Sequence, residues 1–435
     1  MVRSRQREVD VDVTCLDEQG FGRGRFEDRP VALRNALPGE RVHGRILRRR
    51  GGVWYGDAQQ QDGGASERVI PPCPAFPRCG GCSLQHLDYG AQLALKQQRL
   101  LDALAEHSLV PERVRAPVSG PRFHYRFKAR LGVRFVAGEP LVGFREAFSN
   151  RVARMSDCKT LALPLATLLP ELQQTLAALS VPDRVPQVEL AAGDRSQTLV
   201  LRHLDPLSAS DLRRLEALSR ATGVGVYLQS GGPETIAGLS RTSGAQYLNY
   251  VNADYGLSFD FLATDFTQVN PYVNRLLVRA AVLALAPVRG AAAIDLFCGI
   301  GNFSLALAAS GASVLGVEAA PAAVVRARHN AARNGLSGAL GFDVADLYAE
   351  QAVDLPEAQL LLLDPPRSGA GPNLMRWMAT VRPERVAYVS CNPATFAADA
   401  RILRDAGFAL REVGIFDMFP HTAHVETLGL FVREG

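Results

Sequence analysis

The sequence predicts an α/β protein built from three domains, on two observations. A chain of 435 residues is too long for one ordinary hydrophobic core and favours about three domains. Its character also changes twice: short alternating runs broken by glycine lead into a cysteine-rich stretch, and later into strands that alternate with helices. We therefore expect a β-barrel over residues 1–65, a central mixed α+β domain over 70–262 and a doubly wound α/β domain over 263–435.

The first 65 residues have the pattern of a small OB-like β-barrel. Runs such as REVDVDVTCLD and GFGRGRFED alternate apolar with polar residues and are separated by turn residues. The stretch that follows, QQQDGGASERVIPPCP, is polar and ends in prolines, which is typical of a domain boundary. We expect that boundary near residue 70.

The cysteines predict a metal site in the central domain. Seven cysteines occur, and an odd number in a chain without an export signal argues against a disulfide framework. CPAFPRCGGC has the spacing C-x5-C-x2-C, and MSDCKT contains a distant fourth cysteine. Four thiolates bind either a tetrahedral zinc ion or a [4Fe-4S] cluster, and the spacing alone does not distinguish them. The expected ligands are Cys73, Cys79, Cys82 and Cys158.

The net charge of +4 is distributed unevenly. Residues 1–50 have a net charge of +4 and residues 111–154 of +7, so the remainder is acidic. Basic charge confined to two segments favours a polyanionic partner. In PRFHYRFKARLGVRF cations alternate with aromatic residues, which predicts either an edge strand with a solvated face or a strand whose cations contact RNA phosphates.

Composition places the chain among soluble globular proteins, with 47% hydrophobic and 21% charged residues. No apolar stretch approaches the roughly 18 to 20 residues that a membrane helix needs, and the N-terminus lacks the apolar region of a signal peptide. We expect a cytoplasmic protein without membrane contact.

From residue 263 onward, apolar strands alternate with helices. AAAIDLF, ASVLGVEA, QLLLLD and RVAYVS have the character of buried strands, and NRLLVRAAVLALA, NFSLALAA and AAVVRARHNAARNG that of helices. This alternation predicts a parallel sheet that is covered by helices on both faces. Ligands of such sheets bind at the carboxyl ends of the strands.

The segment AIDLFCGIGNFSLALA predicts a cofactor site at that edge. Gly299 and Gly301 allow a sharp turn and a close approach of the backbone to a ligand at the helix N-terminus. Ser304 stands where the dinucleotide motif requires a third glycine, which disfavours NAD. Glu318 ends the next strand, where a carboxylate accepts hydrogen bonds from ribose hydroxyls. Nucleotide cofactors and S-adenosylmethionine both carry such a ribose.

Two aspartates and one cysteine follow other strands of the same sheet. Asp364 stands between four leucines and two prolines, and Asp346 follows a weaker strand, so both are expected at the ligand edge. Cys391 stands between a strand and a helix start, a position that lowers the pKa of a thiol and raises its reactivity. Taken alone, Cys391 is more typical of a small buried residue, and we expect Cys298 to serve packing only.

The chain ends in DMFPHTAHVETLGLFVRE, which we expect to form a closing strand. A hairpin there would bring Glu426 back across the edge of the sheet, although Glu426 by itself resembles an ordinary surface residue.

Four motifs together resemble the RNA uracil-C5 methyltransferases that use S-adenosyl-L-methionine. They are FCGIGNFSL, LLDPPRSG, SCNPATFAAD and PHTAHVETLGLF, and they occur in the order of that family. The resemblance implies a Rossmann-like class I methyltransferase domain in which Cys391 is the nucleophile and Glu426 the base. It also implies that Asp364 contacts either the cofactor or the target base. The implied cofactor-binding residues are Gln268, Phe297, Gly299, Gly301, Asn302, Glu318, Asp346 and Asp364.

The N-terminal segment resembles a TRAM domain, an RNA-binding module, through GFGRGRF and LPGERVHGRI. A chain that combines a TRAM domain with these four cysteines resembles one group of the family. Members of that group act on 23S ribosomal RNA and carry a [4Fe-4S] cluster. The resemblance thus implies this cluster on the four cysteines, 23S rRNA with a flipped uridine as the partner, and a monomer.

Three alternatives stay open at this point. One is a related uridine methyltransferase with a different tRNA or rRNA target. Another is an iron-sulfur oxidoreductase with a nucleotide-binding fold, which the missing third glycine disfavours. The third is an RNA-binding protein whose methyltransferase domain has lost its activity.

Overall fold

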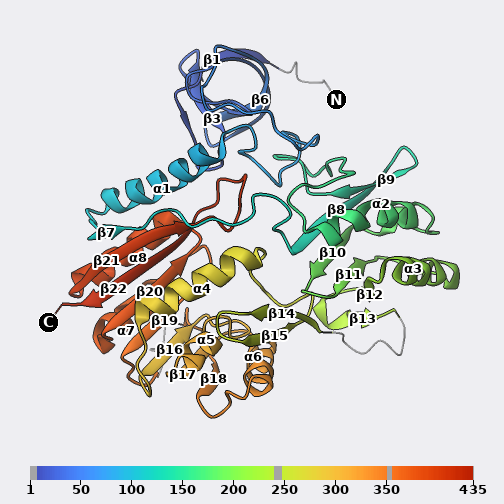
Figure 1. Cartoon of the computed structure of the whole chain (residues 1–435). Coiled ribbons are helices and arrows are strands. Elements are labelled where there is room, and N and C mark those ends of the chain that lie inside the picture. Colours follow the sequence, from blue (N-terminus) through green and yellow to red (C-terminus); the bar gives the residue numbers. More distant parts are fainter. Residues whose placement is uncertain (1–6, 240–246, 350–354, 435) are drawn as a thin grey trace.

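The structure is a computed structural model that describes residues 7–239, 247–349 and 355–434. The first six residues of the expected barrel lie outside these ranges. Figure 1 shows three main bodies: a curved N-terminal sheet at the top, a central sheet on the right, and a large C-terminal sheet at the lower left. Helix α1 (Tyr89–Glu106) lies between the N-terminal and the C-terminal sheets.

The N-terminal sheet curls around a single hydrophobic core. Its order is β1-β5-β6-β4-β3-β2, and β1 also approaches β3. Val9, Val31, Leu33 and Trp54 belong to its core, because alternate residues of each strand face inward. The strands are β1 (Glu8–Asp12), β2 (Cys15–Leu16), β3 (Gly22–Phe26), β4 (Arg29–Arg34), β5 (Arg41–Arg50) and β6 (Val53–Asp62).

The central sheet has the order β13-β12-β11-β10-β8-β9 and is packed against helices α2 and α3. Its elements are β8 (Lys128–Val136), β9 (Glu139–Gly143), α2 (Leu163–Ala177), β10 (Gln187–Ala192), β11 (Gln197–Arg202), α3 (Ala209–Thr222), β12 (Gly225–Gln229) and β13 (Ala237–Gly238), with 3₁₀ turns at Pro182–Arg184 and Pro233–Thr235.

The basic aromatic segment does not form an edge strand, which was one of its two predicted structures. Only its second half is extended, as β8, and β8 lies between β10 and β9. Arg130 forms an ion pair with Glu189 at 2.7 Å, and Lys128 donates a hydrogen bond to the carbonyl of Asp265. Two of its cations are thus engaged within the protein, because the neighbouring strand and a loop supply their partners.

The C-terminal sheet has eight strands in the order β18-β17-β16-β19-β20-β22-β21-β7. Strands β16 to β20 are parallel, and β22 is antiparallel to both of its neighbours. The elements are α4 (Pro271–Leu285), β16 (Ala292–Leu296), α5 (Ser304–Ala309), β17 (Ser313–Glu318), α6 (Pro321–Arg333), β18 (Leu340–Val344), β19 (Leu360–Leu363), α7 (Pro372–Val381), β20 (Arg385–Ser390), α8 (Pro393–Asp405), β21 (Phe408–Phe416) and β22 (Glu426–Arg433).

Both faces of this sheet are buried, as its apolar strands predict. Ala293, Leu360 and Leu362 belong to the core on the side of α4, α5 and α6. The alternate residues, such as Ile294 and Leu361, belong to the core on the side of α1, α7 and α8. A strand that is covered on both faces has no polar side, so its sequence is continuously apolar.

Four helices of the sheet begin with proline at the first helical position, namely α4, α6, α7 and α8. Proline fits there because its φ angle is already helical and its missing N–H has no partner to lose. In α4 and α8 an asparagine caps the helix just before the proline: the side chain of Asn270 accepts from Val273 N, and that of Asn392 from Ala394 N. Asn-Pro therefore sets the start of the helix that follows Cys391.

Part of the expected central domain, 70–262, packs on the C-terminal sheet instead. Helix α1 packs against α8 and β21, and β7 (Arg113–Val114) pairs with β21. The hairpin β14 (Leu248–Asn252) and β15 (Leu257–Phe261) lies against α6. The chain thus reaches the C-terminal sheet before it builds the central one, which the linear order of motifs does not reveal.

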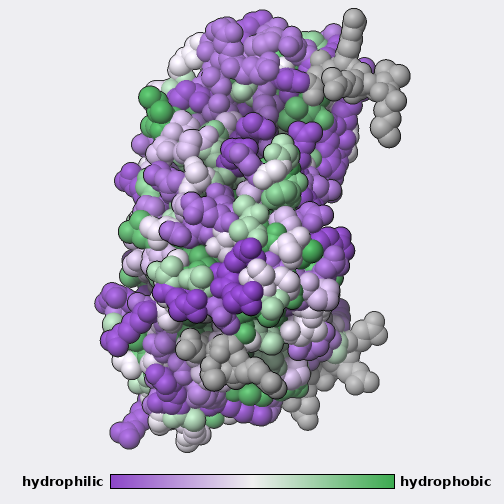
Figure 2. Space-filling view, turned by 90° about the vertical axis from the view of Figure 1, so that its right-hand side faces the viewer, coloured by the Kyte–Doolittle hydropathy of each residue, from purple (hydrophilic) through white to green (hydrophobic). Residues whose placement is uncertain are grey.

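The surface is mainly polar on one broad face. Figure 2 shows this face predominantly hydrophilic at the end formed by the N-terminal sheet, with small scattered hydrophobic groups below. Within residues 7–239, 247–349 and 355–434, no helix combines the length and apolar character that crossing a membrane requires.

Candidate active site

The candidate residues gather where the parallel strands end. The glycine turn follows β16, Glu318 ends β17, Asp364 follows β19 and Cys391 follows β20. Since parallel strands present their carboxyl ends at one edge of the sheet, these groups share that edge.

The glycine turn has a backbone that favours glycine. Gly299 and Gly301 have φ angles of +54° and +91°. A Cβ atom on Gly301 would lie 2.5 Å from Leu305 Cδ1. Glu318 lies against this turn: one carboxylate oxygen accepts from Gly299 N at 3.2 Å and the other from Ala320 N at 2.9 Å. Glu318, the candidate for ribose binding, is thus hydrogen-bonded to the glycine turn.

Asn302 follows the turn and is oriented by a second asparagine. The amides of Asn302 and Asn274 exchange two hydrogen bonds, of 2.9 and 3.0 Å, and the hydroxyl of Tyr250 donates to Asn302 Oδ1 at 3.4 Å. Gln268, which precedes α4, donates from Nε2 to Asp364 Oδ2 at 3.4 Å. The loop before α4 is therefore tied to the tip of β19.

Phe297 and Asp346 are linked through one tyrosine. The rings of Phe297 and Tyr348 are 5.7 Å apart, and the carboxylate of Asp346 accepts from Tyr348 N at 2.9 Å. Asp346 is exposed and is the most peripheral of the predicted cofactor residues.

Asp295 in β16 is a candidate that the sequence analysis missed. It is fully buried, its Oδ2 accepts from the hydroxyl of Ser304, and its Oδ1 has no partner within the described part of the chain. Burial raises the pKa of Asp295 to about 7, and Asp364 and Glu318 add to this, while Ser304 opposes it. An acid inside the apolar run AIDLF was the available signal. Ser304, where the third glycine was missing, supplies its partner.

Glu426 reaches the neighbourhood of Cys391 through strand pairing. In the antiparallel ladder of β20 and β22, Ser390 is paired with Thr427. Cys391, which follows Ser390, therefore lies beside Glu426, which precedes Thr427. Glu426 is only 3% exposed. The structure thereby brings the candidate nucleophile and the candidate base to one place.

The expectation of a lowered pKa for the Cys391 thiol is wrong. Burial raises the pKa of Cys391 to about 11, and the charges of Glu426 and Asp364 raise it further, against the opposing effect of Arg367. Burial also raises the pKa of Asp364 to about 7, and burial together with Asp364 raises that of Glu426. Burial, together with the two carboxylates, therefore outweighs the groups that lower the pKa of this thiol.

Replacing Asp364 with asparagine is expected to make Cys391 more reactive toward iodoacetamide. Above pH ~7 Asp364 is ionised, and its negative charge raises the pKa of Cys391. The neutral asparagine removes that charge, which lowers the pKa of Cys391 and raises the fraction of thiolate. We expect alkylation near pH ~8.5 to be about threefold to tenfold faster, measured by mass spectrometry without RNA or cofactor. Asp405→Asn, at the exposed end of α8, is the control, and slower alkylation of Asp364→Asn would contradict the assignment.

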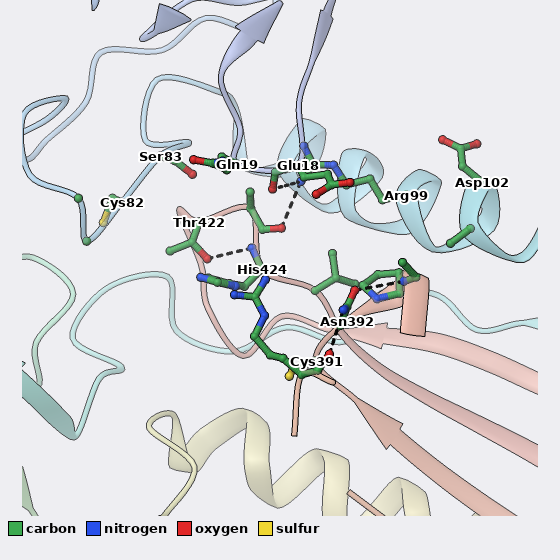
Figure 3. A pocket seen from close by; sticks show the side chains of 18 of the residues that line it. Glu18, Gln19, Cys82, Ser83, Arg99, Asp102, Cys391, Asn392, Thr422 and His424 are labelled. Atoms are coloured by element: carbon green, nitrogen blue, oxygen red, sulfur yellow. Dashed lines mark hydrogen bonds between the residues drawn. The ribbon is translucent and has the colours of Figure 1, made fainter. Parts of the chain in front are cut away.

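Cys391 lines a cavity of ≈ 720 Å³. The other lining residues come from the N-terminal sheet, the cysteine-rich segment, α1 and the C-terminal sheet. Figure 3 shows Cys391 and Asn392 below, Thr422 and His424 in the middle, and Glu18, Gln19 and Arg99 above. Lining residues that the sequence analysis did not single out as site residues include Arg99, Asp102, Arg126, Phe144, Arg367 and His424.

Arg367 belongs to the same edge through its backbone. Its carbonyl accepts a hydrogen bond from Asn392 Nδ2 at 3.0 Å, so the loop after Asp364 is fastened to the cap of α8. Arg367 is the arginine of the motif LLDPPRSG, and the sequence could have identified it as a candidate, because a cation beside a thiol favours the thiolate.

The four predicted metal ligands line a second, smaller cavity, together with Phe76, Gln85 and Phe144. Burial raises the pKa of Cys79 to about 11 and that of Cys82 to about 12, and the neighbouring cysteine sulfurs add to both shifts. The four thiols are therefore near neighbours. Across the described ranges, no three His, Cys, Asp or Glu side chains form a group that could hold a metal ion.

Comparisons with known proteins show which family the chain resembles. The profile of the tRNA (uracil-5-)-methyltransferase family matches residues 88–434. The 23S rRNA (uracil(1939)-C(5))-methyltransferase RlmD of Azoarcus sp. (strain BH72) is 42% identical over 428 residues, which cover 97% of this chain and 99% of that protein. The protein of the same name from Hahella chejuensis (strain KCTC 2396) is 42% identical over 447 residues and is matched over the whole of both chains.

A solved structure shows the same fold. Pyrococcus abyssi tRNA (uracil-54, C5)-methyltransferase, in complex with S-adenosyl-L-homocysteine, superposes with a TM-score of 0.75 at 23% identity, covering 97% of this chain and 100% of that one. These findings confirm the resemblance that the four motifs carried. Because the family profile spans most of the sequence and relatives 42% identical match nearly all of it, the chain belongs to the tRNA (uracil-5-)-methyltransferase family.

Proposed function

We propose that this protein methylates C5 of one uridine in 23S ribosomal RNA, using S-adenosyl-L-methionine and a covalent adduct between Cys391 and C6 of the uracil. The observation that supports the proposal is the pairing of β20 with β22, in which buried Glu426 lies beside Cys391, a residue that lines the cavity. The relatives named as 23S rRNA methyltransferases support the choice of RNA.

The reaction requires both side chains. C5 of uracil is too weak a nucleophile to attack a methyl group, but addition of the Cys391 thiolate to C6 makes the ring an enolate with electron density on C5. After C5 has taken the methyl group, Glu426 removes the C5 proton, and elimination breaks the C6–sulfur bond. Arg367 favours the thiolate, in opposition to the two carboxylates.

The glycine turn and its neighbours would bind the cofactor, which supplies an electrophilic methyl group on sulfur. Glu318 would accept hydrogen bonds from the ribose hydroxyls, and Gly299 and Gly301 would let the backbone approach. The unpartnered oxygen of Asp295 makes it a further candidate for a cationic group of the cofactor. The other proposed contacts are Gln268, Phe297, Asn302, Asp346 and Asp364.

Glu318→Gln is expected to weaken binding of S-adenosyl-L-homocysteine by about tenfold or more. The variant replaces a charged acceptor by a neutral one, and hydrogen bonds to charged groups are worth about 1.5–3 kcal/mol. Isothermal titration calorimetry measures the effect. Glu357→Gln is the matched control, because Glu357 is exposed and precedes β19, at the opposite edge of the sheet. Unchanged affinity in Glu318→Gln would remove Glu318 from the cofactor site.

We further propose a [4Fe-4S] cluster on Cys73, Cys79, Cys82 and Cys158. Four thiols around one cavity fit such a group, since each iron takes one thiolate and the four sulfurs need not converge on a single ion. The methylation needs no electron transfer, so the cluster would stabilise the local structure.

The purified protein is expected to contain iron and acid-labile sulfide at about four of each per chain. Cys158→Ala should lose both, while Cys15→Ala, which changes an exposed cysteine, should keep them. Stoichiometric zinc without sulfide would contradict the cluster.

The N-terminal sheet would act as a TRAM-like RNA-binding module, and it contributes Glu18 and Gln19 to the cavity beside Cys391. The test of the proposed function is transfer of radioactive methyl groups to unmodified 23S rRNA fragments and, in parallel, to unmodified tRNA, with the product mapped by mass spectrometry. Methylation of tRNA alone would move the assignment to the transfer RNA branch of the family.

A further inference from the structure

The loop that leads into Glu426 is attached to the turn that follows Cys82. This loop, residues 417–425, joins β21 to β22. The backbone N–H groups of Ser83 and Leu84 both donate to the carbonyl of His421, each at 2.9 Å. Ser83 is the residue next to Cys82, so one peptide separates a proposed metal ligand from the loop of the proposed base.

Gln92 of α1 fastens both segments at once. Its Nε2 donates to the carbonyls of Leu84 and Leu87, at 3.0 and 2.8 Å, and its Oε1 accepts from His421 N at 3.0 Å. Gln92 is 1% exposed, so water does not replace these bonds.

His421 is itself held in an unusual conformation. Its φ angle is +65°, a region that residues other than glycine rarely adopt, and its ring stacks on Phe123 with centroids 4.5 Å apart. A buried residue in such a conformation persists only where its surroundings determine it. The bonds from Ser83, Leu84 and Gln92 are such surroundings.

The two ends of the loop are anchored differently. At the start, Asp417 is bound within the protein by Lys96 Nζ at 2.5 Å and by the hydroxyl of Tyr89 at 2.7 Å. At the far end, Ala423 packs on the small core formed by Leu37, Leu84 and Leu87. The half of the loop nearer Glu426 therefore packs directly on the turn after Cys82.

The N-terminal sheet also packs against the turn that follows Cys82. A Cβ atom on Gly20 would lie 2.8 Å from Leu84 Cδ2 and 2.9 Å from Ser83 Oγ, which shows how closely the β2–β3 turn approaches. Arg99 donates to the carbonyls of Glu18 and Ala423, at 3.3 and 3.2 Å, as two dashed lines in Figure 3 show. Displacement of the turn would consequently reach the rim of the cavity.

We propose that the turn from Cys82 to Leu87 transmits the state of the four-cysteine site to the 417–425 loop, with Gln92 as the positioning residue that couples them. This inference rests on the proposed roles of the four cysteines and of Glu426. A loaded cysteine site holds Cys82 and hence the two N–H groups that grip His421. An empty site frees the turn, and the loop that leads into Glu426 loses the hydrogen bonds from Ser83 and Leu84.

Hydrogen–deuterium exchange of the full-length protein tests the transmission. We compare the protein as purified with the same protein after metal removal by a chelator. Peptides covering 417–426 should exchange about tenfold faster in the metal-free form, because buried hydrogen bonds are lost locally. Peptides of α6, on the far side of the sheet, should not change. Unchanged exchange at 417–426 would overturn the proposal, and so would equal acceleration in α6, which would indicate general unfolding.

Gln92→Leu tests the coupling without touching a cysteine. We expect unchanged metal content, faster exchange at 417–426, a kcat about tenfold lower and an unchanged affinity for S-adenosyl-L-homocysteine. Gln98→Leu is the matched control on the same helix, because Gln98 is exposed and bonds to Asp102. Loss of metal from Gln92→Leu, or a kcat equal to that of the control, would overturn the role of Gln92.

These readouts are separable from the proposed function. Exchange at 417–426 responds to metal removal whether or not the protein methylates RNA. Absence of methyl transfer in the wild-type protein would refute the function alone, whereas normal transfer by the metal-free protein would refute the transmission alone.

Discussion

Replacing Cys391 with alanine is expected to abolish methylation of uridine, with kcat lower by ~10⁴-fold or more. Without the sulfur no bond forms to C6, and C5 does not become nucleophilic. Because Cys391 stands after β20 and does not belong to a helix or strand, the smaller side chain should leave the fold intact. Transfer of tritiated methyl groups to unmodified RNA measures the loss.

Cys15→Ala provides the control for this variant, since Cys15 is exposed on a strand of the N-terminal sheet. It should methylate RNA at the wild-type rate. Circular dichroism and calorimetry with S-adenosyl-L-homocysteine should show that Cys391→Ala is folded and binds the cofactor product. Residual methylation within tenfold of wild type would show that the covalent mechanism is wrong.

Glu426→Gln is expected to trap the covalent adduct between protein and RNA. Addition of the thiolate and methyl transfer do not need the base, but removal of the C5 proton does, and loss of a general base costs about 10²- to 10⁴-fold. The methylated adduct should therefore accumulate as a band of lower mobility that survives denaturing electrophoresis. Glutamine has nearly the same shape, so the hairpin of β21 and β22 should be preserved.

Two further proteins make this result specific. The double variant Cys391→Ala with Glu426→Gln should give no adduct, because the sulfur is absent. Glu384→Gln, which changes an exposed glutamate before β20, should turn over normally without accumulating adduct. Free turnover by Glu426→Gln would assign proton removal to another group.

The sequence predicted the C-terminal fold well because burial on both faces leaves a strong signal. Runs such as LLLL and RVAYVS are continuously apolar, and Asn-Pro marks the start of two helices. The strands and helices consequently lie close to the expected ranges. The missing third glycine also proved informative, since Ser304 binds the buried Asp295.

The placement of α1 and β7 was not predictable in the same way. Their own sequences predict a helix and a short extended segment, but they do not indicate the surface on which these elements pack. In the structure both lie on α8 and β21, some three hundred residues later in the chain. Long-range packing depends on the shapes of two surfaces, and a single sequence contains no record of their pairing.

The electrostatics of the site also depended on the fold. A cysteine at a helix start suggested a lowered pKa, yet burial and two carboxylates raise it to about 11. Asp364 and Glu426 are sixty-two residues apart in sequence, and their effect arises only because neighbouring strands bring them together. Charge interactions fall off with distance, so they follow the fold and not the sequence order.

By itself the sequence determined the family, the parallel sheet, the glycine turn and the identity of the candidate nucleophile, because each is written in a local pattern of residue types. Only the tertiary structure decided that Glu426 meets Cys391, that α1 belongs with the C-terminal sheet, and that the turn after Cys82 grips the loop before Glu426. The physical reason is that these relations are contacts between distant segments, and contacts exist only once the sheet register and the packing of its neighbours are set.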